Sequence, residues 1–351
     1  MEHFPQELCS LLLCWYDENH RHLPWRESPS PYRTWISEVM LQQTRVEAGI
    51  AYFLRFTEAL PDIPALAAVE DQQLLKLWEG LGYYSRARNL KKAAIQMVEQ
   101  HQGKVPDDFA ALCKLPGIGE YSAGAIASIA YNIRVPAVDG NVLRVAARLL
   151  NNSRNMEEPA VKRDIRQKVS EVLPQQRVGD FNQSLMELGA LICLPNGRPL
   201  CESCPLADLC EANRLGCQQT LPTRIKKPTR RTEQKTVLLL RCGDQVLLRQ
   251  RPPRGLLASL WEFPSMPGLL TLQEAAEAFD VPPEAVIPLG EARHIFTHIV
   301  WQMTGYQIVL SPDSPQPEGC IGILLPELLT KYPIPSAYSY YLRQLSPQSP
   351  P

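Results

Sequence analysis

The sequence lacks any run of apolar residues close to the roughly 18 that a membrane-spanning helix requires. It also lacks an excess of basic residues, because 37 Asp and Glu offset 36 Lys and Arg and leave a formal net charge of −1. This balance argues against binding nucleic acid by overall charge, although contact with DNA needs only a local basic face. The apolar stretch 9–16 is short, flanked by acidic residues and without the basic start of a signal peptide, so we expect an amphipathic helix.

The ten cysteines lack the arrangement of a secreted disulfide framework. Four lie between residues 193 and 210. The other six are scattered, mostly in apolar surroundings: Cys9, Cys14, Cys113, Cys217, Cys242 and Cys320. This distribution is typical of a reducing, cytoplasmic setting with one metal site. With 351 residues, 45% hydrophobic and 21% charged, the chain is expected to form a soluble protein of two domains.

The stretch from residue 112 to 146 carries the most informative pattern. Its L-P-G-I-G segment, residues 115–119, predicts a tight turn followed at once by a helix of small residues over about 121–130. Gly117 and Gly119 let the chain reverse and point consecutive N–H groups outward, to which the helix start adds its own. Such a turn binds anions, and a phosphodiester suits it best. The alternative is a chance glycine turn.

Two carboxyl groups are candidates for chemistry. The string V-D-G-N-V, residues 138–142, places Asp139 beside a glycine at the start of an apolar helix, where Asp is also a common N-cap. A capping serine and a proline precede a predicted helix over residues 32–44. Glu38 lies beside the apolar stripe of that helix, where a carboxyl tends to have a raised pKa and can hold a proton near neutrality. A plain rim carboxylate is the alternative.

Other side chains are candidates for contact with DNA. Tyr83 follows a glycine loop and precedes a basic helix, which suits an aromatic wedge inserted into a base stack or a tyrosine that packs a helix start. Gln183 offers a donor and an acceptor to an adenine edge, although by itself it looks like a surface glutamine. The basic groups at 86–92 and at Arg144 and Arg148 are candidate phosphate contacts or solvated helix faces.

The spacing Cys193-x7-Cys201-x2-Cys204-x5-Cys210 is the most specific signal in the composition. Four thiols within a polar, proline-containing segment cannot all serve core packing. The candidates are zinc and an iron–sulfur cluster. Zinc sites usually have two short-spaced pairs, whereas here one short pair has uneven spacings around it.

The character of the chain changes after about residue 217. Residues 218–234 are basic and rich in Pro and Thr, which predicts an interdomain linker lying along an acidic partner. Residues 235–240 and 245–250 flank Cys-Gly-Asp and predict a β-hairpin, with a helix over 272–279 further on. The string H-I-F-T-H at 294–298 predicts a functional loop or a strand with alternating apolar residues.

Together these strings resemble the helix-hairpin-helix DNA glycosylases, in which L-P-G-x-G is the DNA-clamping hairpin and V-D-G-N-V carries a catalytic aspartate. The strings S-E-V-M-L-Q-Q-T-R-V at 37–46 and P-W-R at 24–26 resemble, more narrowly, the adenine DNA glycosylase (MutY) family. The resemblance covers about residues 3–345.

The resemblance implies roles for the catalytic residues. Glu38 would protonate adenine at N7, and Asp139 would stabilise the oxocarbenium ion that develops on the sugar. Tyr121 and Asn141 would position these groups and the water. Tyr121 stands where strand-cutting relatives such as endonuclease III have a Schiff-base lysine, so we expect a monofunctional glycosylase.

The resemblance also implies the substrate contacts. Thr297 stands where the family has serine and keeps the hydroxyl while adding a methyl group. The expected contacts are Gln183 at the adenine pocket, Arg26 of the P-W-R motif as a further substrate contact, Tyr83 and Gln43 as wedges from two sides, Phe296, Thr297 and His298 on 8-oxoguanine, and Gly117 and Gly119 on the DNA backbone.

For the metal site the resemblance implies a [4Fe–4S] cluster on Cys193, Cys201, Cys204 and Cys210, bracing a loop with basic residues against DNA. The family usually has six residues between the first two cysteines and this chain has seven, which makes Cys217 a possible substitute ligand.

The second domain resembles the Nudix fold. The segment from Gly268 to Glu274 matches only the opening of the Mg²⁺-binding box, so we expect the scaffold without the metal chemistry.

We therefore predict a mainly α helix-hairpin-helix glycosylase domain with an iron–sulfur cluster loop (1–217, cluster at 193–210), a basic linker (218–234), an α+β Nudix-like lesion-recognition domain (235–346) and a disordered tail (347–351). The predicted activity is removal of adenine opposite 8-oxoguanine or guanine in duplex DNA by a monomer, cytoplasmic or, in a bacterium, associated with the nucleoid. The alternatives are an endonuclease III-like glycosylase and lyase for oxidised pyrimidines, and a non-catalytic lesion sensor.

Overall fold

The computed structural model describes residues 3–223, 229–311, 314 and 316–345. It divides into two compact units, the first formed by Met1–Val69 and Asn89–Lys226 and the second by Glu70–Arg88 and Lys227–Pro351. The predicted tail at 347–351, and residues 224–228 of the predicted linker, lie outside the described residues. In the described part of the chain no helix is long and apolar enough to cross a membrane.

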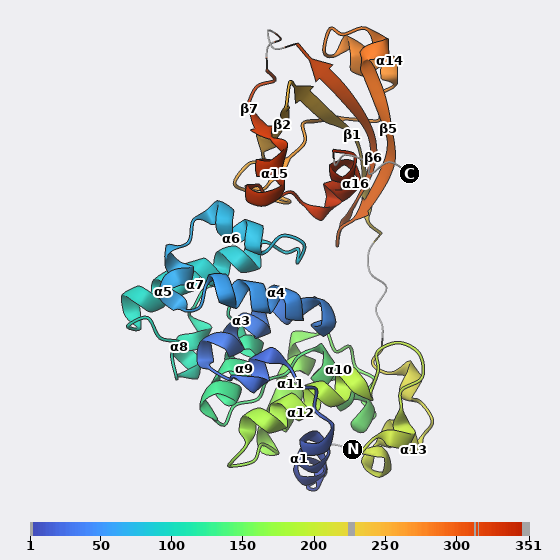
Figure 1. Cartoon of the computed structure of the whole chain (residues 1–351). Coiled ribbons are helices and arrows are strands. Elements are labelled where there is room, and N and C mark those ends of the chain that lie inside the picture. Colours follow the sequence, from blue (N-terminus) through green and yellow to red (C-terminus); the bar gives the residue numbers. More distant parts are fainter. Residues whose placement is uncertain (1–2, 224–228, 312–313, 315, 346–351) are drawn as a thin grey trace. The chain divides into compact units, whose positions relative to one another are not determined.

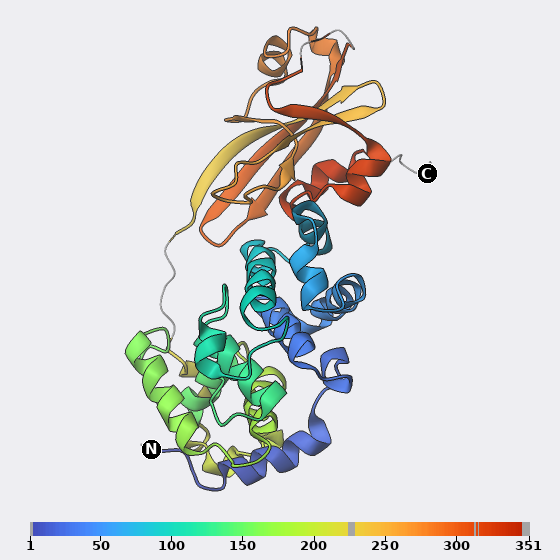
Figure 2. The ribbon, with the colours of Figure 1, turned by 90° about the vertical axis from the view of Figure 1, so that its left-hand side faces the viewer.

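The first unit is helical (Figures 1 and 2). Its helices are α1 (Leu8–Asn19), α2 (Pro24–Glu27), α3 (Pro31–Leu41), α4 (Val46–Ala59), α5 (Ile63–Ala68), most of α7 (Ser85–Gln100), α8 (Phe109–Cys113), α9 (Glu120–Tyr131), α10 (Gly140–Leu149), α11 (Pro159–Glu171), α12 (Val178–Leu191) and α13 (Glu211–Arg214). Side chains begin several of them: Ser30 accepts a hydrogen bond from the N–H of Arg33 at the start of α3, and Asp139 accepts one from Val142 at the start of α10.

Small residues on α9 let other helices approach it closely. Its buried face is made mainly of serine, glycine and alanine, and α9 packs against both α3 and α12. The buried side chains of α1, α10, α11 and α12 form a common core that includes Leu8, Val145, Ile165 and Phe181. This packing brings together α3, the start of α9, the start of α10 and α12, which carry the predicted catalytic and adenine-contacting residues.

The early helix is shorter than its sequence pattern predicts. We predicted a helix over residues 32–44, but α3 ends at Leu41. The chain cannot continue as a right-handed helix because Gln43 has a φ of 64°, in the left-handed region. Gln43 is therefore on an exposed turn after the helix.

The second unit contains α6 (Asp71–Leu77), the first residues of α7, and a mixed sheet (Figure 1). The strands are β1 (Arg231–Cys242), β2 (Gln245–Gln250), β3 (Trp261–Glu262), β4 (Ser265–Pro267), β5 (Val286–Ile295), β6 (Ile299–Leu310) and β7 (Cys320–Leu324), and the helices α14 (Leu272–Glu277), α15 (Leu325–Lys331) and α16 (Ser339–Arg343) accompany them. The main order is β3-β2-β1-β6-β5, with β4 paired to β1 and β7 to β2. Only the pairing of β1 with β6 is parallel among the described strands.

Alternate residues of β1 point to opposite faces of this sheet, as the period of a strand requires. Leu238 and Leu240 contribute to a core with α14, whereas Val237 and Leu239 contribute to a core with Tyr338 and the C-terminal helices. β1 and β2 form the predicted hairpin.

Two boundaries in this unit differ from the sequence prediction. β1 begins at Arg231 instead of residue 235, because the end of the predicted linker pairs with β6 from Ile299 onward. α14 ends at Glu277 instead of residue 279. Glu274, the last matching residue of the Nudix box, closes a capping box with Thr271 at the start of α14.

Candidate active site

Glu38 and Tyr121 meet where α3 packs against α9. The Tyr121 hydroxyl donates a hydrogen bond of 2.6 Å to Oε2 of Glu38. Burial raises the pKa of Glu38 to about 7, helped by the charge of Asp139 and opposed by the bond from Tyr121 and the charge of Arg26. Burial also raises the pKa of Tyr121 well above its usual value, so Tyr121 acts as a donor. Glu38 can therefore carry a proton near neutral pH.

Asp139 has surroundings richer in donors. Its Oδ1 accepts a 2.8 Å bond from the N–H of Val142, and its Oδ2 accepts a 2.7 Å bond from Nδ2 of Asn141. Burial raises the pKa of Asp139 above its ordinary value, while those bonds and the charge of Arg144 lower it. Burial has the largest effect on this pKa and outweighs the hydrogen bonds at the helix start. Compared with Glu38, Asp139 has more hydrogen bonds that favour the ionised form.

The position of Asn141 is set from two sides. Its Oδ1 accepts a 2.8 Å bond from Arg144, and Arg144 also donates to the carbonyl oxygens of Cys193 and Gly189 at 2.8 Å each. A Cβ at Gly189 would lie 2.6 Å from Cβ of Asn141, so only glycine fits there. α12 therefore holds the start of α10, and with it Asp139.

The four predicted catalytic residues thus lie in one site of the first unit. Asp139 lies close enough to Glu38 and Tyr121 for its charge to raise the pKa of each. Two carboxyls in unlike surroundings, one with a pKa near neutrality and one that accepts two hydrogen bonds, are suited to hydrolysis of a glycosidic bond.

Arg26, a predicted substrate contact, is in direct contact with Gln183, the residue predicted at the adenine pocket. Nε of Arg26 donates a 2.9 Å bond to Oε1 of Gln183. This bond occupies one of the two lone pairs of the Gln183 carbonyl oxygen and turns the amide so that its N–H groups are donors for a ligand.

Sequence reasoning missed Glu187, one helical turn after Gln183 on α12. It is 2% exposed and accepts bonds from Arg21 (2.7 Å to Nε) and Arg26 (3.2 Å to Nη2). Burial alone would raise the pKa of Glu187, but the hydrogen bonds from Arg21 and Arg26 lower it to about 2. Glu187 therefore holds Arg26 in place, and Arg26 in turn orients Gln183. The i, i+4 spacing of Gln183 and Glu187 was the available signal.

The glycine hairpin has the geometry that its sequence predicts. Gly117 has a φ of 78°, and a Cβ there would lie 2.7 Å from Cβ of Asn89. Gly119 is the N-cap of α9, and no atom lies within 4 Å of the Cβ position it lacks. The hairpin thus offers an open helix start to an anion.

The predicted basic groups contain both inward-facing arginines and the exposed Lys92. Arg144 and Arg148 are 8% and 3% exposed and donate to main-chain carbonyls near Cys193. Arg86 lies over the ring of Trp78, and burial lowers its pKa to about 10. These arginines have structural contacts because their long side chains reach inward from helix faces that the sequence pattern leaves ambiguous.

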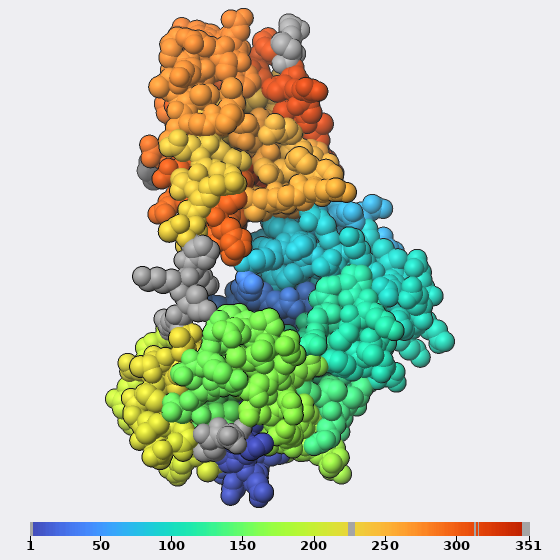
Figure 3. All heavy atoms as spheres, turned by 180° about the vertical axis from the view of Figure 1, so that it is seen from behind, coloured from blue at the N-terminus to red at the C-terminus, as the bar shows by residue number. Residues whose placement is uncertain are grey.

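The four clustered cysteines line one cavity together with Arg148 and Gln218. Nη1 of Arg148 donates a 3.2 Å bond to Sγ of Cys193. Cys217 points elsewhere and contacts Asn151. The donor set, four thiols around one cavity, fits a group that takes four thiolates. Among the described residues, no three His, Cys, Asp or Glu side chains form a group that could hold a single metal ion. Figure 3 shows the yellow-green segment that carries these cysteines.

The second unit contains Tyr83 and the loop at 296–298, which were predicted to contact DNA at the lesion. Tyr83 is 48% exposed and has a φ of 46°. Its hydroxyl lies 2.7 Å from Oγ1 of Thr297. The Phe296 ring packs on Trp301 and His294, and the segment is a loop between β5 and β6, not a continuous strand. Like Gln43, Tyr83 combines a left-handed backbone with exposure, a combination that recurs at functional sites.

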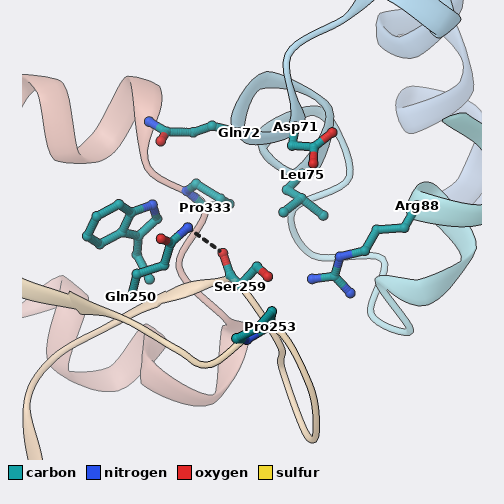
Figure 4. A pocket seen from close by; sticks show the side chains of 9 residues that line it. Asp71, Gln72, Leu75, Arg88, Gln250, Pro253, Ser259 and Pro333 are labelled. Atoms are coloured by element: carbon teal, nitrogen blue, oxygen red, sulfur yellow. Dashed lines mark hydrogen bonds between the residues drawn. The ribbon is translucent and has the colours of Figure 1, made fainter.

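A separate pocket in the second unit contains none of the residues predicted for catalysis, base contact or metal binding, although Arg88 of the predicted basic group at 86–92 lines it (Figure 4). It is lined by side chains that include Asp71, Arg88, Gln250 and Ser259, and Gln250 donates a 3.2 Å bond to the Ser259 carbonyl across it. Its lining has no pair of groups arranged for the chemistry described above.

Comparison with known proteins gives matches for both parts of the chain. Residues 36–173 match the HhH-GPD superfamily of base excision DNA repair proteins, and residues 236–344 match the NUDIX domain. An adenine DNA glycosylase of Rattus norvegicus is 35% identical, covering 87% of this chain and 70% of the relative. An adenine DNA glycosylase of Buchnera aphidicola subsp. Baizongia pistaciae is 32% identical and covers 86% of each chain. The solved structure of a thermostable thymine-DNA glycosylase superposes with a TM-score of 0.54 at 26% identity, covering 59% of this chain and 95% of that one.

Proposed function

Because the chain belongs to the adenine DNA glycosylases of the HhH-GPD base excision repair superfamily, we propose that it removes adenine mispaired with 8-oxoguanine or guanine from duplex DNA. The chain is a DNA glycosylase of base excision repair. Its mispair specificity, the roles of its individual residues and its cofactor are proposals.

The observation that carries the proposal is that two carboxyls in unlike surroundings, Glu38 and Asp139, lie close enough for the charge of one to raise the pKa of the other. Glu38, with a pKa of about 7 and one donor on its carboxyl, delivers a proton to N7 of the extruded adenine. Adenine then leaves as a neutral base. Asp139, held by Val142 and Asn141, faces the positive charge that develops on the sugar and stabilises it.

The remaining site residues prepare the substrate. Gln183, with its carbonyl oxygen bonded to Arg26, offers its N–H groups to the ring nitrogens of the base. The hairpin at Gly117 and Gly119 binds a phosphate next to the extruded nucleotide. Tyr83 and Gln43 fill the space that the base leaves in the stack. Thr297, with its neighbours in the loop, reads the opposite base.

The chemistry is tested by base release from three duplexes that contain A:8-oxoguanine, A:G or thymine glycol, followed by hot alkali. Strand breaks that appear only after alkali, and only in the first two duplexes, are expected. Release from the thymine glycol duplex would instead favour the endonuclease III-like alternative, and no release from any duplex would favour a sensor. Glu38→Gln should abolish base release and retain DNA binding, because the amide keeps the shape and lacks the acidic proton.

We also propose that Cys193, Cys201, Cys204 and Cys210 hold a [4Fe–4S] cluster. When bound, such a cluster would be a structural brace that ties the loop after α12 to Arg148 on α10. Iron and sulfide content of the purified protein tests this. Cys193→Ala should lose iron, whereas Cys217→Ala should keep it, because Cys217 does not line the cavity. The opposite result would make Cys217 the ligand.

A further inference from the structure

The 296–298 loop is held by the residues with which the chain enters the sheet. Nε of Arg230 donates a 3.1 Å bond to the carbonyl oxygen of Phe296. The N–H of Arg231 donates a 3.1 Å bond to the carbonyl oxygen of His298. Two consecutive residues therefore occupy the carbonyls on either side of Thr297. The loop closes on itself through a 2.8 Å bond from the N–H of Phe296 to the carbonyl of Ile299.

The start of β1 also supports Trp301, the ring on which Phe296 of the loop packs. Phe296 packs on Trp301 with ring centroids 4.8 Å apart. Trp301 is 1% exposed, and its indole N–H donates a 2.9 Å bond to Glu233. The ammonium of Lys235 lies 3.8 Å from the centroid of the Trp301 ring. The start of β1 thus supports the loop both at its carbonyls and at the anchoring aromatic ring.

We propose that Arg230 is a positioning residue that sets the preference for 8-oxoguanine over guanine by fixing the backbone around Thr297. The inference rests on the proposed function of the loop. The two opposite bases differ in a few atoms, so discrimination depends on where one hydroxyl and its neighbouring peptide groups are held. Arg230 differs from the other supports because it acts through a side chain on the loop's own carbonyl. It can therefore be removed without unpairing β1 from β6.

The test uses the full chain and compares single-turnover rates of base release from A:8-oxoguanine and A:G duplexes. Arg230→Ala should lower the ratio of the two rates about two- to fivefold through the 8-oxoguanine rate, a modest effect because the Arg230 side chain is exposed and water can partly replace its bond. Arg230→Lys should recover part of the ratio, because an ammonium can still reach the Phe296 carbonyl.

Arg231→Ala is the matched control. Its side chain is 70% exposed and pairs with Glu233 at 2.5 Å, whereas its bond to the loop comes from the main chain. The variant removes the same charge one residue along and should keep the wild-type ratio. Any loss of general DNA affinity is common to both variants and cancels in the ratio.

The outcomes are separable. A wild-type ratio in Arg230→Ala, or an equal fall in Arg231→Ala, would overturn the positioning role. A wild-type enzyme with no preference for A:8-oxoguanine would overturn the proposed specificity itself, and the inference with it. The unfolding midpoints of the variants show whether a lower rate ratio comes from loss of the sheet. If Arg230→Ala loses the sheet, the rate ratio of Arg230→Lys tests the positioning role instead.

Discussion

Replacing Tyr121 with phenylalanine should move the pH dependence of base release upward. Glu38 acts in its protonated form, so the rate falls as pH rises through its pKa of about 7. The Tyr121 hydroxyl donates to the ionised carboxylate and thereby lowers that pKa. Without the donor, the carboxylate loses its stabilisation and the pKa rises further, so the falling limb shifts to higher pH.

The magnitude follows from the bond that is lost. A hydrogen bond to a charged group contributes about 1.5–3 kcal/mol, and one pKa unit corresponds to about 1.4 kcal/mol, which gives a shift of about one to two units. The solvent that enters the vacated space reduces the shift, so we expect about one unit. The absolute rate should also fall, because Glu38 loses a group that orients it.

The assay is the apparent second-order rate constant of adenine release, with the enzyme in excess and below saturation, at a series of pH values. This constant reports the ionisation of the free enzyme. Tyr131→Phe is the matched control, because Tyr131 lies on the same helix and donates to the carbonyl of Val105, away from the site. A limb that stays in place or moves to lower pH in Tyr121→Phe would refute the assignment of that limb to Glu38.

Two substitutions and one trapping experiment have definite expected outcomes. Glu187→Gln should lower the free energy of unfolding at pH 7 by about 3 kcal/mol, because a pKa lowered from 4.5 to about 2 represents about that much stability. This contribution is present above pH 4.5 and is lost as pH falls toward 2, so urea unfolding of wild type and variant should converge in acid. Gly189→Ala should cost about 1–3 kcal/mol and slow base release, because its Cβ would displace Asn141; unchanged rates would contradict this. Borohydride should trap no covalent complex with DNA, because Tyr121 has no amine; an efficiently formed adduct would show a lyase.

Much of the fold followed from local patterns. The fold class, a helical HhH-GPD domain and a Nudix-like domain, and the family are confirmed by the matches to known proteins. The Pro-Gly-x-Gly string determines its own turn because it needs a φ that glycine adopts freely, and Asp139 caps α10 with its own side chain. These features depend on residues within a few positions of each other, so a single sequence reveals them.

The tertiary structure decided what depends on distant partners. The pKa of Glu38 is set first by burial, which no local pattern measures, and then by Tyr121 and Asp139, which lie far along the chain. The same holds for the bonds of the buried Glu187 to Arg21 and Arg26, and for the buried side chains of Arg144 and Arg148. Charged side chains on neighbouring helices meet only after the helices have packed. The contact of Arg230 with Phe296 likewise exists only because β1 pairs with β6. Sequence determines which groups are available, and packing determines which of them lie within reach of one another, because electrostatic and hydrogen-bond energies depend on distance and on exclusion of water.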